Sequence, residues 1–424
     1  MRSSRLRLAC VGLALVFVGV TVARVVAFQS AAERRIARYA AATPVDAVSR
    51  LQQRVDAGEV TLTFDKQFGY LPSLLSALHV PVSSQLLVFS KTSFQLDRIA
   101  PWSPRAVYFG DEVYVGWVQR GTIIEIASVD PSLGGVFYTL DQQATAKPKF
   151  ERQTHNCLQC HDSSLNTGGV PGFVVQSVYT DRYGYPLPSS HNPVSSDRTR
   201  LRDRFGGWYV TGTHGDQVHM GNLMAPEAAR EIGNVSVYLD RLDLKATGNV
   251  TDLSKRFNTK PYLSSGSDIA ALMLLIHQSS LHNAMTQASL DADGRDAASS
   301  AEALVRELLF IGEARLTAPV AGSPQFVADF TKAGPRDHQG RSLRDLDLTR
   351  RLLKYPLSYL IYSDGFNGLP ASVKTFVARR LTEILTGKDA SGDFASLTPA
   401  DRQAIVEILQ DTKPGFLMLP ATER

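Results

Sequence analysis

The amino-acid sequence predicts an α+β fold with a β-rich N-terminal part, a loop-rich middle and an α-helical C-terminal part. Short runs of Val, Ile, Tyr and Phe, separated by turn residues, fill positions 85–142. Gly-rich and polar sequence follows, most clearly over 205–227, and beyond residue 268 apolar residues recur with a period of 3.6. We therefore expect a β-rich domain over residues 33–225 and an α-helical domain over 226–424, preceded by a leader of 32 residues.

The leader, residues 1–32, has the composition of an export signal. Three arginines among the first seven residues precede an apolar run of 16 residues, Leu8 to Ala23, and small residues at 30–32 offer a cleavage site. A membrane-spanning helix needs about 17–25 apolar residues, so a cleaved signal and an uncleaved N-terminal membrane anchor are both open, with cleavage favoured. We expect the rest of the chain in the periplasm, soluble after cleavage or tethered to the inner membrane.

Composition and charge exclude some partners. The chain has 424 residues, 44% of them hydrophobic and 20% charged, which is enough to bury a large core. The four arginines of the leader account for the formal net charge of +4, so the remaining chain is neutral. A neutral chain gives no reason to expect binding to nucleic acid or to an anionic membrane surface.

Each predicted element has a local basis. Residues 32–57 are rich in Ala, Arg and Gln and predict a helix, Gly110-Asp111 predicts a hairpin turn between two strands, and 172–187 resembles a second hairpin. The expected C-terminal helices are Asp268–Met285, Ala301–Arg315, Val373–Leu385 and a last helix with Thr398 as N-cap and Pro399 at the first helical position.

The segment "HNCLQCHDSS", residues 155–164, carries the chemistry. It contains both cysteines found outside the leader, Cys157 and Cys160, and His161 follows directly. Cysteines three residues apart lie on one side of a helical turn, from which both can form thioether bonds to the two vinyl groups of one haem. The adjacent histidine can then supply the proximal ligand of the iron. The pattern predicts covalently bound haem c.

In these three residues and in its export signal the chain resembles the c-type cytochromes. The resemblance implies haem c as the cofactor, one-electron transfer as the activity, and redox proteins of an electron-transport chain as partners. In the small class I cytochromes the motif lies near the mature N-terminus on a helix, whereas here more than a hundred residues of largely β-like sequence precede it. We therefore expect a haem set into a larger domain, not the class I fold.

Other uses of the two cysteines are open. A structural zinc ion needs further ligands, and His214 and His219 could supply them. A disulfide between Cys157 and Cys160 would close a very small loop. A thioredoxin-like pair is disfavoured because a Lys-Pro-Lys loop, not a βαβ unit, precedes the motif. With zinc or a disulfide, the chain would be an exported structural or interaction protein.

The second axial ligand is expected downstream. The segment "HGDQVHMGNLM" contains His214, His219, Met220 and Met224, and His219 or Met220 is the favoured distal ligand because both lie between small residues. A methionine ligand raises the reduction potential, as suits an electron carrier, while an open position permits binding of a small molecule. His277 and His282, on a predicted helix, are expected to be structural.

The favoured function is therefore that of an exported mono-haem c-type cytochrome that transfers single electrons, and no residue is assigned a catalytic role. The alternative is a haem c enzyme or gas-binding sensor with an open sixth position, because the chain is much larger than a simple carrier needs. No other catalytic pattern, such as Gly-x-Ser-x-Gly or a P-loop, occurs in the sequence.

Overall fold

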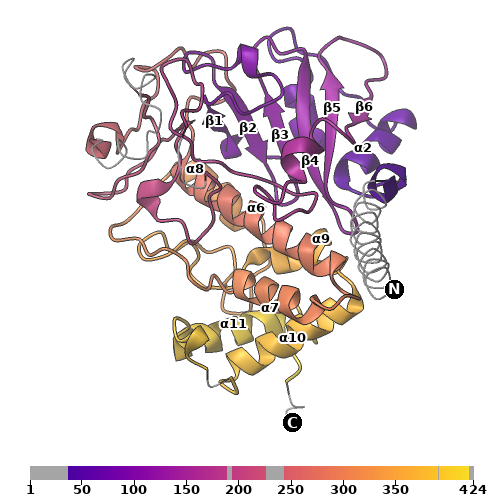
Figure 1. Ribbon diagram of the computed structural model, residues 1–424, viewed down its shortest axis with the longest axis vertical. Helices are drawn as coiled ribbons and strands as arrows, with labels where there is room; N and C mark the ends of the chain where they lie inside the picture. Colours follow the sequence, from indigo (N-terminus) through magenta and orange to yellow (C-terminus); the bar gives the residue numbers. More distant parts are fainter. Residues whose placement is uncertain (1–36, 189–192, 226–242, 390, 420–424) are drawn as a thin grey trace, which may run out of the picture. The chain divides into compact units, whose positions relative to one another are not determined.

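The computed structural model describes residues 37–188, 193–225, 243–389 and 391–419 (Figure 1). The chain forms two compact units, residues 1–44 and 45–424, and the fold described below is that of the second. The expected leader lies outside the described residues, as do residues 226–242. Among the residues that are described, none forms a helix long and apolar enough to cross a membrane.

A seven-stranded sheet forms the centre of the second unit, and together with the helices it makes the fold mixed α+β. The strand order is β6-β5-β4-β3-β2-β1-β7, and every neighbouring pair is antiparallel. The strands are β1 (Leu86–Val88), β2 (Arg105–Phe109), β3 (Val113–Trp117), β4 (Ile123–Asp130), β5 (Gly134–Asp141), β6 (Phe150–Arg152) and β7 (Trp208–Tyr209). The strands predicted within 85–142 are thus present, with Gly110-Asp111 at the turn between β2 and β3.

The helices lie mostly after the sheet in the sequence. They are α2 (Ala47–Asp56), α3 (Leu71–Ala77), α4 (Leu158–His161), α6 (Ile269–Leu290), α7 (Ala297–Leu308), α8 (Pro324–Lys332), α9 (Asp364–Asn367), α10 (Ala371–Leu385) and α11 (Pro399–Thr412). Thr398 caps α11 as predicted, in a reciprocal capping box with Asp401. The helix expected over 301–315 ends at Leu308, because Phe310 and Gly312 both have a positive φ.

The hairpin expected over residues 172–187 forms only as a short turn over residues 179–187, without regular strands. The segment makes isolated bridges, Thr180 with Pro186 and Gln176 with Val194, and no regular strand pair. Across the turn, the amide of Leu187 donates to the Tyr179 carbonyl. Before the turn the amides have partners outside the segment: that of Gly172 donates to the His161 carbonyl and that of Val178 donates to the Gly206 carbonyl. The first part of the segment therefore runs from the cysteine motif towards β7, and the chain folds back on itself only over residues 179–187.

The hydrophobic core covers both faces of the sheet. One cluster packs Val107, Phe109 and Tyr114 against α6 and continues into α7, α10 and α11. The other packs the alternate strand residues, such as Ala106 and Val115, against α2 and α3. Figure 1 shows α6 lying between the sheet and α7. The first cluster contains residues from both sides of position 225, so the core is continuous across the boundary expected between the two domains.

Candidate haem site

The cysteine motif forms one helical turn shortly after the edge strand β6. Cys157 precedes the four-residue helix α4, and its carbonyl accepts a hydrogen bond of 3.0 Å from the His161 amide. Both thiols are free, Cys160 is exposed and Cys157 is half-buried. Burial raises the pKa of the Cys157 thiol to about 11, with the nearby Glu125 carboxylate adding to the shift. The turn predicted from the cysteine spacing is therefore present.

The ring of His161 is held as one neutral tautomer. Its Nδ1 lies 2.9 Å from the Gly172 carbonyl oxygen, and because a carbonyl can only accept, Nδ1 must carry the proton. Burial lowers the pKa of His161, so the ring is neutral at pH 7. The lone pair is then on Nε2, the atom with which a histidine fixed in this way binds a metal.

Helix α6 fixes the acceptor of this hydrogen bond. Asn283 clasps the residue after Gly172: its Oδ1 accepts from the Phe173 amide at 2.8 Å and its Nδ2 donates to the Phe173 carbonyl at 2.7 Å. A Cβ atom at Gly172 would lie 2.2 Å from Asn283 Oδ1, so this approach requires glycine. Phe137 of β5 packs on the His161 ring, with centroids 4.5 Å apart. The imidazole is thereby held between the sheet and α6.

A charged pair lies on the sheet face next to the motif. Arg105 Nη2 on β2 is 2.7 Å from Glu125 Oε2 on β4, and Ser93 Oγ lies 2.9 Å from each carboxylate oxygen of Glu125. The other alternate residues of these strands on this face are apolar. Sequence reasoning did not single out this pair, although two charges at inward positions of apolar strands were a signal that could have identified it.

The structure does not bring His219 or Met220 to His161. Their loop follows β7 and lies at the beginning of α6, where the Ile269 amide donates to the Thr211 carbonyl. Gly172, the partner of His161, lies instead beside Asn283, further along α6. Fourteen residues of helix, or about 21 Å, separate Asn283 from Ile269. β5 and β7 are also five strand spacings apart, about 24 Å. The ligand atoms on opposite sides of one metal ion lie within about 4 Å of each other. His219 and Met220 are therefore too far from His161 to bind the same metal ion.

His214 and His219 instead form a buried pair of their own. Their ring centroids are 4.7 Å apart, His214 Nε2 accepts from the Asn249 amide at 2.9 Å and His219 Nδ1 accepts from the Gly221 amide at 3.0 Å. Burial, and secondarily the neighbouring His214, lowers the pKa of His219 to about 3. Met224 packs against the second core cluster, on the sheet face opposite α6. Since this loop is remote from Cys157, it does not complete a zinc site with the cysteines, and the described residues contain no group of three or more metal-binding side chains.

Helix α6 carries two further buried histidines. His277 Nδ1 lies 2.7 Å from Asp197 Oδ2 and its Nε2 lies 2.8 Å from Ser358 Oγ, the order of contacts found in serine hydrolases. His277 and Ser358 are both 0% exposed, so no substrate can reach the hydroxyl. His282 Nε2 donates to the Asp111 carbonyl at 2.8 Å. These contacts tie α6 to its surroundings, which agrees with the structural role expected for both histidines.

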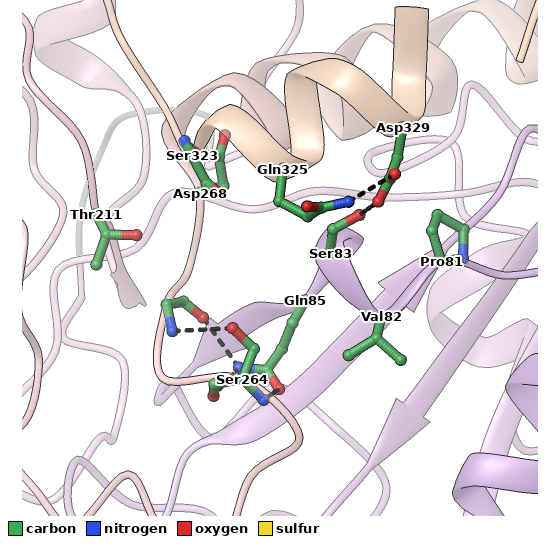
Figure 2. A pocket seen from close by; sticks show the side chains of 11 residues that line it. Pro81, Val82, Ser83, Gln85, Thr211, Ser264, Asp268, Ser323, Gln325 and Asp329 are labelled. Carbon is green, nitrogen blue, oxygen red and sulfur yellow. Dashed lines mark hydrogen bonds between the residues drawn. The ribbon is translucent and has the colours of Figure 1, made fainter. Parts of the chain in front are cut away.

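A cavity of about 370 Å³ lies at the beginning of α6 (Figure 2). Both carboxylates that line it are already engaged within the protein. Asp329 accepts from Ser83 at 2.6 Å, and Asp268 accepts from the amides of Ala271, at 2.9 Å, and Ser323. Asp268 therefore connects the start of α6 to the start of α8. Asp329 connects α8 to the segment before β1.

Comparison of the chain with protein-family models, with curated proteins and with solved structures finds no match. Its chemistry must therefore be inferred from its own residues. Of the groups described above, the motif residues Cys157, Cys160 and His161 combine free reactive atoms with a fixed geometry.

Proposed function

We propose that this protein is an exported mono-haem c-type cytochrome that transfers single electrons. The observation that carries the proposal is the fixed tautomer of His161, with Nδ1 bonded to Gly172 O at 2.9 Å and Nε2 left to bind iron, beside two free thiols on the same turn. Cys157 and Cys160 would hold haem c covalently, and His161 would be its proximal ligand. Bound there, the group would supply a one-electron Fe(III)/Fe(II) couple.

The surroundings of the motif suit this role. Phe137 and the clasp of Asn283 on Phe173 restrict rotation of the imidazole, and the exposure of Cys160 leaves one side of the motif accessible. An edge of the cofactor near the surface is what electron transfer to a partner protein requires. The proposed cytochrome differs from class I members because its motif lies beside a seven-stranded sheet. Its proposed location is the periplasm, free or tethered by the N-terminal segment, and its proposed partners are redox proteins.

The first experiment asks whether haem is covalently bound. The full chain is expressed with a haem c maturation system, denatured, and tested for iron and for a pyridine haemochrome spectrum. We expect one haem per chain in the wild type and in Cys10→Ala, the matched control in the leader, and loss of stable attachment in Cys157→Ala and Cys160→Ala. Zinc in place of iron, or haem that acid-acetone extracts completely from the wild type, would contradict the proposal.

The position of His219 and Met220 favours a second candidate function. Because both lie far from His161, the sixth position of the iron would be open to a small molecule, as in a haem c enzyme or gas sensor. Carbon monoxide added to the reduced protein distinguishes the two functions. A stoichiometric change in the absorption spectrum supports the sensor or enzyme, and an unchanged spectrum supports a six-coordinate electron carrier.

A further inference from the structure

The charged pair next to the motif has an unusual geometry. To reach Glu125 on β4, Arg105 on β2 must extend across the intervening strand β3. It crosses at Gly116, where a Cβ atom would lie 2.2 Å from Arg105 Nη2. Only glycine at this position lets the guanidinium lie against the strand. The side chains of Arg105 and Glu125 are 23% and 15% exposed, so the pair is mostly removed from solvent.

Arg105 has donor capacity that its partner does not use. A guanidinium has five N–H donors, and the ion pair with Glu125 uses Nη2. Within the described part of the chain, Arg105 Nε is buried and has no acceptor. The carboxylate of Glu125 receives the Ser93 hydroxyl as well, so its oxygens are already shared. A buried donor without an acceptor is uncommon in folded proteins, so the guanidinium keeps hydrogen-bonding capacity beyond its pair with Glu125.

The pair lies close to the motif along the sheet. Glu125 is opposite Thr139 in the β4–β5 pairing. Thr139 Oγ1 accepts from Gln153 Nε2 at 3.0 Å, and Gln153 lies four residues before Cys157. Phe137, two residues before Thr139 and on the same face of β5, packs on His161. Both Arg105 and Glu125 also act electrostatically on the Cys157 thiol and the His161 ring. A group attached to Cys157 would therefore come within reach of the guanidinium.

We propose that Arg105 binds a propionate carboxylate of the haem and that Glu125 and Gly116 hold its guanidinium in position. This inference rests on the proposed function. Haem carries two propionates at one edge of its ring, and guanidinium is the protein group best suited to bind carboxylates through paired N–H donors. Arg105 thus positions the cofactor edge. Its positive charge near the iron also favours the less positive Fe(II) state.

The test measures reduction potential and its pH dependence in haem-loaded protein. In Arg105→Gln, we expect the ratio of Fe(II) to Fe(III) at a fixed applied potential to fall about tenfold, a decrease of 59 mV for a one-electron couple. Gly116→Ala should lower the potential in the same direction because it displaces the guanidinium without removing its charge. The exposed Arg98, which donates to the Arg120 carbonyl, gives the control variant Arg98→Gln, with an unchanged potential.

A double-mutant cycle separates propionate binding from a simple ion pair. If Arg105 serves only Glu125, then Arg105→Gln made in a Glu125→Gln background should leave the pH dependence of the potential unchanged, even though the loss of its charge lowers the potential itself, and that result overturns the inference. We expect instead a shifted pH dependence in addition to the decrease, since the propionate loses its cation. A wild type without covalent haem overturns the proposed function as well, whereas haem-loaded variants with unchanged potentials overturn this inference alone.

Discussion

A single backbone carbonyl determines the chemistry of His161. Free imidazole exchanges between two tautomers, but Gly172 O can accept only from Nδ1–H, and burial disfavours the charged ring. The same residue donates its amide to the His161 carbonyl at 2.8 Å, so the two residues are linked twice. The tautomer of His161, with its lone pair on Nε2, therefore depends on a glycine eleven positions away in the sequence.

Gly172→Ala should disturb the site without changing any ligand. The new Cβ would lie 2.2 Å from Asn283 Oδ1, so the clasp on Phe173 must open. We expect a loss of about 1–3 kcal/mol in the free energy of unfolding, the usual cost of overpacking, and, where the proposed haem is bound, a changed absorption spectrum of its reduced form. Urea titration and visible spectroscopy measure the two effects.

Gly392→Ala provides the control for this substitution. A Cβ atom at Gly392 would have no neighbouring atom within 4 Å, and the residue does not have a positive φ, so alanine is accommodated there. The stability and spectrum of this variant should match those of the wild type. Equal behaviour of the two alanine variants would show that the contact between Gly172 and Asn283 does not constrain His161.

Among the elements, α6 connects the sheet to the C-terminal helices, and Asp268 determines where it begins. The carboxylate caps α6 by accepting from the Ala271 amide at 2.9 Å, and it also accepts from the amide of Ser323, the residue before α8. Burial raises the pKa of Asp268. One side chain thus fixes the start of two helices that the whole of α7 separates along the chain.

Asp268→Ala should destabilise the protein by about 2 kcal/mol, because it removes a helix cap and leaves the Ser323 amide without its acceptor. Asp296→Ala is the matched control, since Asp296 precedes α7 and makes no side-chain capping bond. Its effect should stay within about 0.5 kcal/mol. Chemical denaturation of both variants tests the prediction, and equal losses would contradict a special role for Asp268.

The elements were predictable to the extent that their signals are local. Runs of Val, Ile, Tyr and Phe between turn residues predicted β2 to β5, and the apolar period predicted α6. The hairpin expected at 172–187 is reduced to a short turn because the amides of Gly172 and Val178 donate to carbonyls of other segments. The spacing alone is enough to select Cys157, Cys160 and His161 as candidate site residues. The sequence could not predict the residues that surround them, which are Gly172, Asn283, Arg105 and Glu125. Their positions relative to His161 depend on strand order and on the path of α6, which no local pattern specifies.

At the scale of the whole molecule, the core contains ionisable groups whose contributions to the free energy of unfolding change with pH in opposite directions. Burial raises the pKa of Glu112 and of Glu313 to about 7. For each, the folded state retains a proton that the unfolded state releases above about pH 4.5, so stability falls as pH rises from 4.5 to 7. Burial lowers the pKa of His282 to about 4, which gives the opposite slope.

His282→Gln isolates the histidine contribution. Between pH 6.5 and about 4 the unfolded wild type binds a proton at His282 that the folded protein does not, so the free energy of unfolding falls as pH decreases through this window. A shift of this size corresponds to about 3 kcal/mol. Glutamine can still donate to the Asp111 carbonyl but does not titrate.

We therefore expect the stability of the wild type relative to His282→Gln to decrease by up to about 3 kcal/mol from about pH 7 to about pH 4, measured by urea unfolding at each pH. The contributions of Glu112 and Glu313 cancel in this difference because both proteins contain them. The exposed His338 is the control: its hydrogen bond with Asp411 raises its pKa, so its stabilisation is present at low pH and is lost as pH rises. A difference between wild type and His282→Gln that does not vary with pH would mean that His282 has the same pKa in the folded and unfolded states, which its enclosure between α6 and the sheet opposes.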